Sequence, residues 1–135
     1  MLVSFLLLEN KMTNSEWKVF FEDAIKKISS NLDKKGAEYA PNGDRFQNFK
    51  TQARLKGTDV FDALVGNRVK HTASLEDMAK GLVPLTKSLI DEKCMDDICY
   101  GLLQWGLFYD AAGIQIHSAK DVSWHNNDEA PHGVS

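Results

Sequence analysis

The sequence predicts an all-α protein with four helices in one compact domain. Apolar residues recur at the three- and four-residue spacings of amphipathic helices along most of the chain. No segment alternates between apolar and polar residues for long enough to predict a strand. A length of 135 residues suffices for a single hydrophobic core. Because each helix buries one apolar stripe, we expect a bundle or an intertwined dimer.

The first predicted helix spans residues 15–34. Ahead of it, "TNSE" is typical of a capping box from Thr13 to Glu16. We expect the helix to stop at Gly36, and "APNGD" (residues 40–44) is typical of a turn. Its apolar stripe comprises Trp17, Phe20, Phe21, Ala24, Ile25, Ile28 and Leu32.

The second predicted helix spans residues 45–55, with Asp44 as its N-cap. The third begins near Thr58, also a predicted N-cap, and continues to Gly81. Its pattern does not decide whether the helix breaks around residues 71–74. The fourth helix is predicted over residues 88–112.

These helices define the predicted domain organisation. We expect an N-terminal extension over residues 1–11, an all-α domain over residues 12–115, and a polar, flexible tail over residues 116–135. The apolar run at residues 2–8 is far shorter than the roughly 20 residues of a membrane span. The sequence therefore predicts no membrane association.

Composition and charge exclude further classes of function. A net charge of -3 without a basic cluster argues against binding to duplex nucleic acid. Cys94 and Cys99 lie five residues apart on one predicted helix, where their side chains point about 140° apart. A disulfide between them is excluded, and we expect reduced thiols in a cytoplasmic protein.

The stretch "DEKCMDDICY" (residues 91–100) concentrates carboxylates at the start of the fourth helix. On a helical wheel, Asp97 falls on the solvent face, and Asp91 suits the helix dipole. Glu92 and Asp96 lie one turn apart at the edge of the apolar arc, where two like charges need a cation. That cation is either a metal ion or a basic side chain, for which the candidates are Arg54, Arg68 and Lys70.

A second polar group surrounds the turn before the second helix. In one interpretation Asp44 caps the helix, Arg45 and Lys50 face solvent, and Tyr39 packs. In the other, Glu38 and Asp44 belong to a rim that binds phosphate and Mg²⁺, balanced by the basic side chains. His71 in "NRVKH" reads as a cap or surface residue rather than a catalytic base.

The motif order "KGAEY…GDRFQNF…ARLKG…VKH…IDEKCMDDICYGLLQWGLF" resembles small phage and prophage proteins of the MazG-like, all-α nucleotide pyrophosphohydrolase type. The resemblance spans about residues 34–109. The matching positions are Lys35, Glu38, Tyr39, Asp44, Phe46, Asn48, Phe49, Lys70, His71, Asp96 and Tyr100.

The resemblance implies a MazG-like bundle completed by homo-oligomerisation, in the host cytoplasm if the chain is phage-encoded. It also implies Mg²⁺ or Mn²⁺ and a metal-activated water that cleaves a nucleoside triphosphate to a monophosphate and pyrophosphate. The implied metal ligands are Glu38, Asp44, Glu92 and Asp96, with Glu38, Glu92 and Asp96 catalytic. The implied substrate-binding residues are Tyr39, Arg45, Asn48, Lys70 and Tyr100.

The chain departs from the family pattern in its carboxylates. Catalytic members carry an E-x-x-E pair on the first helix, whereas here Glu38 and Asp44 are separated by a turn. Cys99 stands where an asparagine is usual. Two functions therefore stay open: a hydrolase, or a non-catalytic phage protein that sequesters a nucleotide or binds a host or defence protein.

Overall fold

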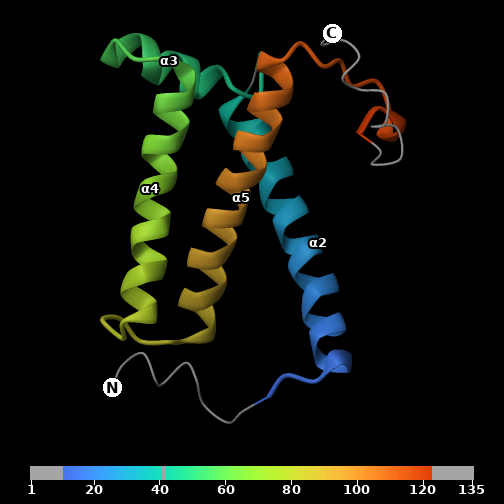
Figure 1. Ribbon diagram of the computed structural model, residues 1–135, viewed down its shortest axis with the longest axis vertical. Helices are drawn as coiled ribbons and strands as arrows, with labels where there is room; N and C mark the ends of the chain where they lie inside the picture. Colours follow the sequence, from blue (N-terminus) through green and yellow to red (C-terminus); the bar gives the residue numbers. More distant parts are fainter. Residues whose placement is uncertain (1–10, 41, 123–135) are drawn as a thin grey trace, which may run out of the picture. The chain divides into compact units, whose positions relative to one another are not determined.

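The computed structural model describes residues 11–40 and 42–122 (Figure 1). Within these ranges there are four α-helices, no strand and one short 3₁₀ helix, which confirms the predicted all-α class. None of the described helices is long and apolar enough to cross a membrane. The elements in chain order are α2 (Asn14–Tyr39), α3 (Gln47–Lys56), α4 (Val60–Ala79), α5 (Lys87–Ala111) and η1 (Ala119–Val122).

The chain divides into two compact units, Met1–Gln104 and Trp105–Ser135. The first unit contains α2, α3, α4 and most of α5, and the second contains the last turns of α5 together with η1. The predicted boundaries at residues 11 and 115 stay predictions. Nearly all of the predicted extension, and the tail from residue 123 on, lie outside the described residues.

The start of α2 is fixed by the predicted capping box. The Thr13 Oγ1 accepts the Glu16 N–H at 3.1 Å, and the Glu16 carboxylate accepts the Thr13 N–H at 2.9 Å. The predicted stop at Gly36 is wrong, because α2 runs on to Tyr39 and closes with a bond from the Ala40 N–H to the Gly36 carbonyl at 3.0 Å.

Two predicted caps are displaced by one or two residues. Asp44 accepts the Phe46 N–H at 3.0 Å in the turn, so that α3 begins at Gln47 without a side-chain cap. The cap of α4 is Asp59, which accepts the Asp62 N–H at 2.8 Å, and not Thr58.

The helix α4 is continuous from Val60 to Ala79, with no break at residues 71–74. The Ser74 hydroxyl donates to the Lys70 carbonyl at 3.2 Å, and the Thr72 hydroxyl lies 3.4 Å from the Arg68 carbonyl. A hydroxyl in this position shares the carbonyl four residues earlier with the backbone N–H, so Thr72 and Ser74 can lie within a continuous helix.

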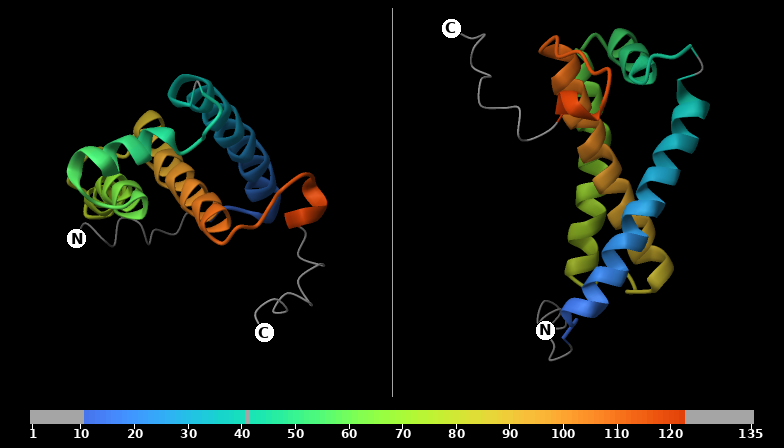
Figure 2. Two further views of the ribbon diagram at one scale, coloured as in Figure 1. Left: turned by 90° about the horizontal axis from the view of Figure 1, so that it is seen from above. Right: turned by 90° about the vertical axis from the view of Figure 1, so that its right-hand side faces the viewer.

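The core of the first unit centres on the contact between α3 and α4. Phe49 and Ala53 of α3 are buried there with Ala63 and Leu64 of α4, and Leu64 is fully buried. Figure 2 shows α3 across the end of α4 at which α4 begins. This packing holds one wall of the pocket described below.

The helix α5 contacts a different neighbour on each side. Toward α2, the Cys99 Sγ accepts a hydrogen bond from the Asn31 amide at 3.5 Å. Toward α4, the Asp97 carboxylate lies 3.4 Å from the Arg68 Nε and accepts the Thr72 hydroxyl at 3.1 Å. The prediction that Asp97 faces solvent is therefore wrong, because α5 packs on two faces rather than on one.

Candidate functional site

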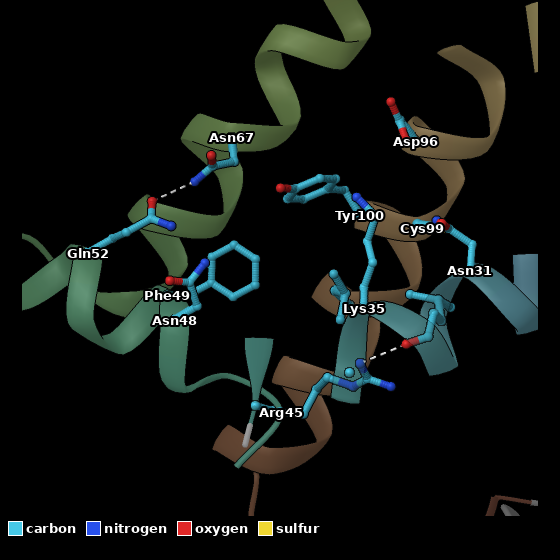
Figure 3. Close-up of a pocket in the computed structure, with 14 residues that line it drawn as sticks. Asn31, Lys35, Arg45, Asn48, Phe49, Gln52, Asn67, Asp96, Cys99 and Tyr100 are labelled. Carbon is cyan, nitrogen blue, oxygen red and sulfur yellow. Dashed lines mark hydrogen bonds between the residues drawn. The ribbon is translucent and has the colours of Figure 1, made fainter. Parts of the chain in front are cut away.

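A cavity of about 240 Å³ opens within the first unit, among α2, α3, α4 and α5 (Figure 3). Side chains from all four helices and from the turn before α3 reach it. Its lining combines amides, two cations, two aromatic rings and one carboxylate. The lining residues are Asn31, Leu32, Lys35, Gly36, Ala40, Arg45, Asn48, Phe49, Gln52, Asn67, Asp96, Cys99, Tyr100 and Leu103.

Arg45 forms one end of the pocket. Its Nη1 donates to the Leu32 carbonyl at 2.9 Å, so the guanidinium lies against the backbone of α2. A Cβ at Gly36 would lie 2.6 Å from the Arg45 Cζ, so the guanidinium would have to shift for any residue other than glycine. Lys35 comes from the same turn of α2, and its side chain runs toward Tyr100 (Figure 3). The pocket thus carries positive charge at two points.

Amide side chains form the wall between α3 and α4. The Asn67 Nδ2 donates to the Gln52 Oε1 at 2.8 Å and to the Ala63 carbonyl at 2.7 Å. These two bonds use both hydrogens of the Asn67 amide. Within the described part of the chain, the Asn67 oxygen and the Gln52 NH₂ group have no further partner, and Asn48 adds a third amide beside them. This wall therefore presents both donors and acceptors to a ligand.

Aromatic rings meet at Tyr100 of α5. Its ring lies edge-on to Phe49, with centroids 6.0 Å apart and an interplanar angle of 74°. On another side, the His71 ring is 4.8 Å away and tilted by 31°. The His71 Nδ1 is 3.8 Å from the Asp96 Oδ2, so a histidine and a carboxylate stand together next to this ring. Tyr100 is held from two helices and offers a positioned flat surface.

Neither cysteine suits a nucleophilic role. Burial raises the pKa of the Cys99 thiol, and the bond from Asn31 only partly opposes that rise. Burial also raises the pKa of Cys94, with Asp91 and Asp97 adding to the effect. Both thiols are therefore protonated at neutral pH, and nucleophilic catalysis needs the thiolate.

Four of the predicted site residues line the pocket: Arg45, Asn48, Asp96 and Tyr100. The others do not meet there. Glu38 and Lys70 are exposed and outside the lining, and the Tyr39 side chain lies outside the described part of the structure. The sequence did not predict a ligand-binding role for the other polar residues that line the pocket. These are Asn31, Lys35, Gln52, Asn67 and Cys99.

The four carboxylates predicted to bind metal are separated in the structure. Asp44 is bound by the Lys50 ammonium at 2.7 Å, and this bond, followed by the Phe46 N–H, holds the pKa of Asp44 below its usual value. The Glu92 side chain is 59% exposed, 3.3 Å from the Lys93 ammonium. Glu38 is exposed, and Asp96 alone reaches the cavity. The expectation of Glu92 at the edge of the core is therefore wrong.

The described side chains do not fit a resident divalent metal. Within the described ranges, no group of three or more histidine, cysteine, aspartate or glutamate side chains could hold a metal ion. Mg²⁺ takes oxygen ligands in a near-octahedral arrangement, and Asp96 with the nitrogen of His71 does not supply them. We therefore derive no step through a metal at this pocket.

The expectation for Asp91 also changes. The fourth helix begins at Lys87, with the Thr86 hydroxyl accepting the Leu89 N–H at 3.3 Å. Asp91 sits one turn further on and pairs with Lys87 at 2.5 Å, which lowers the pKa of Asp91. It acts in an ion pair rather than at the helix start.

Comparisons with models of known protein families, with curated proteins and with solved structures find no match to this chain.

Proposed function

We propose that the pocket of the first unit binds a nucleotide and that the chain holds it without hydrolysing it. The observation that carries this proposal is the convergence of amides, a positioned aromatic pair and two cations on one cavity. The amides and the rings match a base, and the cations match a phosphate.

The base is assigned to the amide wall and the aromatic rings. Asparagine and glutamine amides pair with the donor and acceptor atoms on base edges. Stacking of a base on an aromatic side chain contributes about 1–3 kcal/mol. Gln52 and Asn67 are tied together at 2.8 Å, so they meet a base in a fixed orientation.

The phosphate is assigned to the end formed by Arg45. A guanidinium binds phosphate oxygens through two parallel N–H bonds, and the bond to the Leu32 carbonyl fixes its position. The cavity of about 240 Å³ is smaller than the roughly 300–1,000 Å³ of pockets that enclose drug-sized ligands. It suits a base and part of a sugar, with the phosphate at the exposed side chain of Arg45.

The absence of hydrolysis is proposed from the donor set. Phosphoryl-transfer sites stabilise charge on the phosphates with metal ions held by carboxylates. Among the described carboxylates, Asp96 alone lines the cavity, while the Asp44 side chain is bound by Lys50 and the Glu92 side chain is exposed. A sequestering role is the better match for such a site than the pyrophosphohydrolase activity that the family resemblance implies.

The experiment is a titration of the full chain with nucleosides and with nucleoside mono-, di- and triphosphates, each in EDTA and in Mg²⁺. Calorimetry gives the affinity, and an assay for pyrophosphate runs in parallel. We expect at least one nucleotide to bind in EDTA without pyrophosphate release. Arg45→Gln should weaken that affinity about tenfold to a hundredfold by removing a charged hydrogen bond, and should change nucleoside binding little.

The matched control is Arg54→Gln, which removes the same charge from an exposed position on α3 outside the pocket. It should leave the affinity unchanged. No binding by any nucleotide would refute the proposal. Release of pyrophosphate that needs Mg²⁺ and disappears in Asp96→Asn would instead establish the hydrolase.

A further inference from the structure

The Asp96 carboxylate lines the pocket, yet neither the base nor the phosphate is assigned to it. Its side chain is 25% exposed, against 59% for Glu92 one turn earlier on α5. Within the described ranges its one ion pair is with His71, whose Nδ1 lies 3.8 Å from the Asp96 Oδ2, beyond hydrogen-bond distance. Both carboxylate oxygens therefore keep lone pairs that a ligand in the pocket can meet.

Asp96 and Arg45 lie at opposite ends of the pocket, as Figure 3 shows. Asn31 of α2 lies level with Cys99 of α5, and the two helices run in the same direction (Figure 1). Asp96 precedes Cys99 by three residues. The Arg45 guanidinium lies against Gly36, five residues after Asn31. Eight residues of helix, at 1.5 Å each, separate the two charged groups by about 12 Å along the helices.

This separation decides which part of a nucleotide meets Asp96. The sugar joins the phosphate to the base, so a nucleotide whose phosphate meets Arg45 turns the far edge of its base, the edge opposite the sugar, toward Asp96. That edge carries an amino group in adenine and cytosine, and a keto oxygen in hypoxanthine and uracil. The far edge is therefore a hydrogen-bond donor in one class of base and an acceptor in the other.

The polar groups of the lining differ in whether they distinguish these two classes. The amides of Gln52 and Asn67 contain both donors and acceptors, so the amide wall can pair with either kind of edge. An ionised carboxylate only accepts. Asp96 can therefore accept a hydrogen bond from an amino group. A keto oxygen in the same place would leave the carboxylate removed from water and without a donor, which is unfavourable.

We infer that the pocket selects a nucleotide whose base carries an amino group on its far edge, adenine or cytosine, and that Asp96 recognises this group. The inference rests on the proposed nucleotide site and adds the class of base. Carboxylates accept from the cytosine amino group when proteins read bases. One hydrogen bond to a charged group, made with one base and not with the other, corresponds to a difference in affinity of about tenfold.

The test compares nucleotides that differ only at the far edge of the base. The 5′-mono- and triphosphates of cytidine and uridine form one pair, those of adenosine and inosine the other, and each is titrated against the full chain in EDTA. In each pair that binds, we expect the amino-bearing member to bind about tenfold more tightly. Asp96→Asn should bring this ratio close to one, because an amide both donates and accepts. The matched control is Glu92→Gln, which removes a carboxylate from α5 outside the pocket and should leave the ratio unchanged.

The ratio within a pair separates recognition of the base from a structural role of Asp96. Should Asp96→Asn impair folding, His71→Gln removes the ion pair, keeps the carboxylate and should retain the preference. Equal affinities within each pair, or tighter binding of the keto member, would overturn the inference and leave the nucleotide site in place. An equal loss for both members in Asp96→Asn would also overturn it, because the carboxylate would then act only on the structure. No binding by any of these nucleotides would refute the nucleotide site itself.

Discussion

A close approach between the Arg45 guanidinium and the backbone of α2 at Gly36 sets one end of the pocket. The sequence suggested Gly36 only as a helix stop, because glycine is common at helix ends. Its role inside the helix, as the space that Arg45 fills, depends on a contact nine residues away across a turn. Periodicity along the chain carries no information about such a contact.

Gly36→Ala separates stability from binding. Alanine favours a helix interior by about 1 kcal/mol over glycine, so the backbone should not be weakened. Its Cβ would nevertheless displace Arg45, and we expect a loss of nucleotide affinity similar to that of Arg45→Gln. Gly66→Ala is the control, because an added Cβ there meets nothing within 4 Å. It should leave affinity unchanged, and equal affinity in both variants would contradict the role given to Gly36.

Asp44 makes stability depend on pH in a defined direction. Its pKa is lowered in the folded chain by the Lys50 ammonium, so the pair stabilises the fold above the unfolded pKa of about 3.9. That contribution is lost as the pH falls through the lower, folded value. Asp44→Asn should therefore lower the melting temperature at neutral pH, and the difference from the parent should disappear in acid. A difference that grows on acidification would contradict the ion pair.

Among the missed residues, the amides left a readable signal in the sequence. Asn31 follows Ile28 at a spacing of three on the apolar stripe of the first helix, and Asn67 follows Ala63 and Leu64 on the inner side of the third. A polar side chain at such a position needs a hydrogen-bond partner or a ligand. Treating these amides as exceptions in the stripe would have indicated the pocket.

At the scale of the elements, local signals were sufficient where the cause was local. The capping box at Thr13 depends on neighbours in sequence, and the structure confirms it. The prediction for the acidic stretch of α5 was wrong where the cause was a contact with another helix. A helical wheel assumes one buried face, whereas α5 packs on α2 through Cys99 and on α4 through Asp97. Two partners bury residues that a single stripe assigns to solvent.

Within the acidic stretch, Asp97 lies in a part-buried ion pair and Glu92 is exposed, so alanine should affect stability differently at the two positions. Asp97→Ala removes the charged partner of Arg68 and the acceptor of the Thr72 hydroxyl, and it should cost about 1 kcal/mol of unfolding free energy. Glu92→Ala changes an exposed side chain and should cost within about 0.5 kcal/mol. Urea unfolding of both variants provides the comparison. A larger loss for Glu92→Ala would restore the interpretation in which Glu92 is the constrained carboxylate.

At the scale of the whole molecule, the sequence predicted the all-α class with four helices but not how their side chains meet. The carboxylates that resemble a metal site are spread over separate faces, while the pocket forms from amides on three helices. The contact between α3 and α4 joins Gln52 to Asn67, and Asn31 reaches the same cavity from α2. The arrangement of a bundle follows from long-range contacts, which a single sequence does not specify.

The central claim is that a nucleotide occupies the pocket with its base against the amide wall. Side-chain NH₂ groups give separate signals in a nitrogen–proton correlation spectrum, so the wall can be observed directly during a titration with the tightest nucleotide. We expect the NH₂ signals of Asn48, Gln52 and Asn67 to shift together and saturably, while those of Asn14 and Asn42, outside the pocket, stay in place. Shifts confined to residues outside the pocket, or none at saturating nucleotide, would contradict the account.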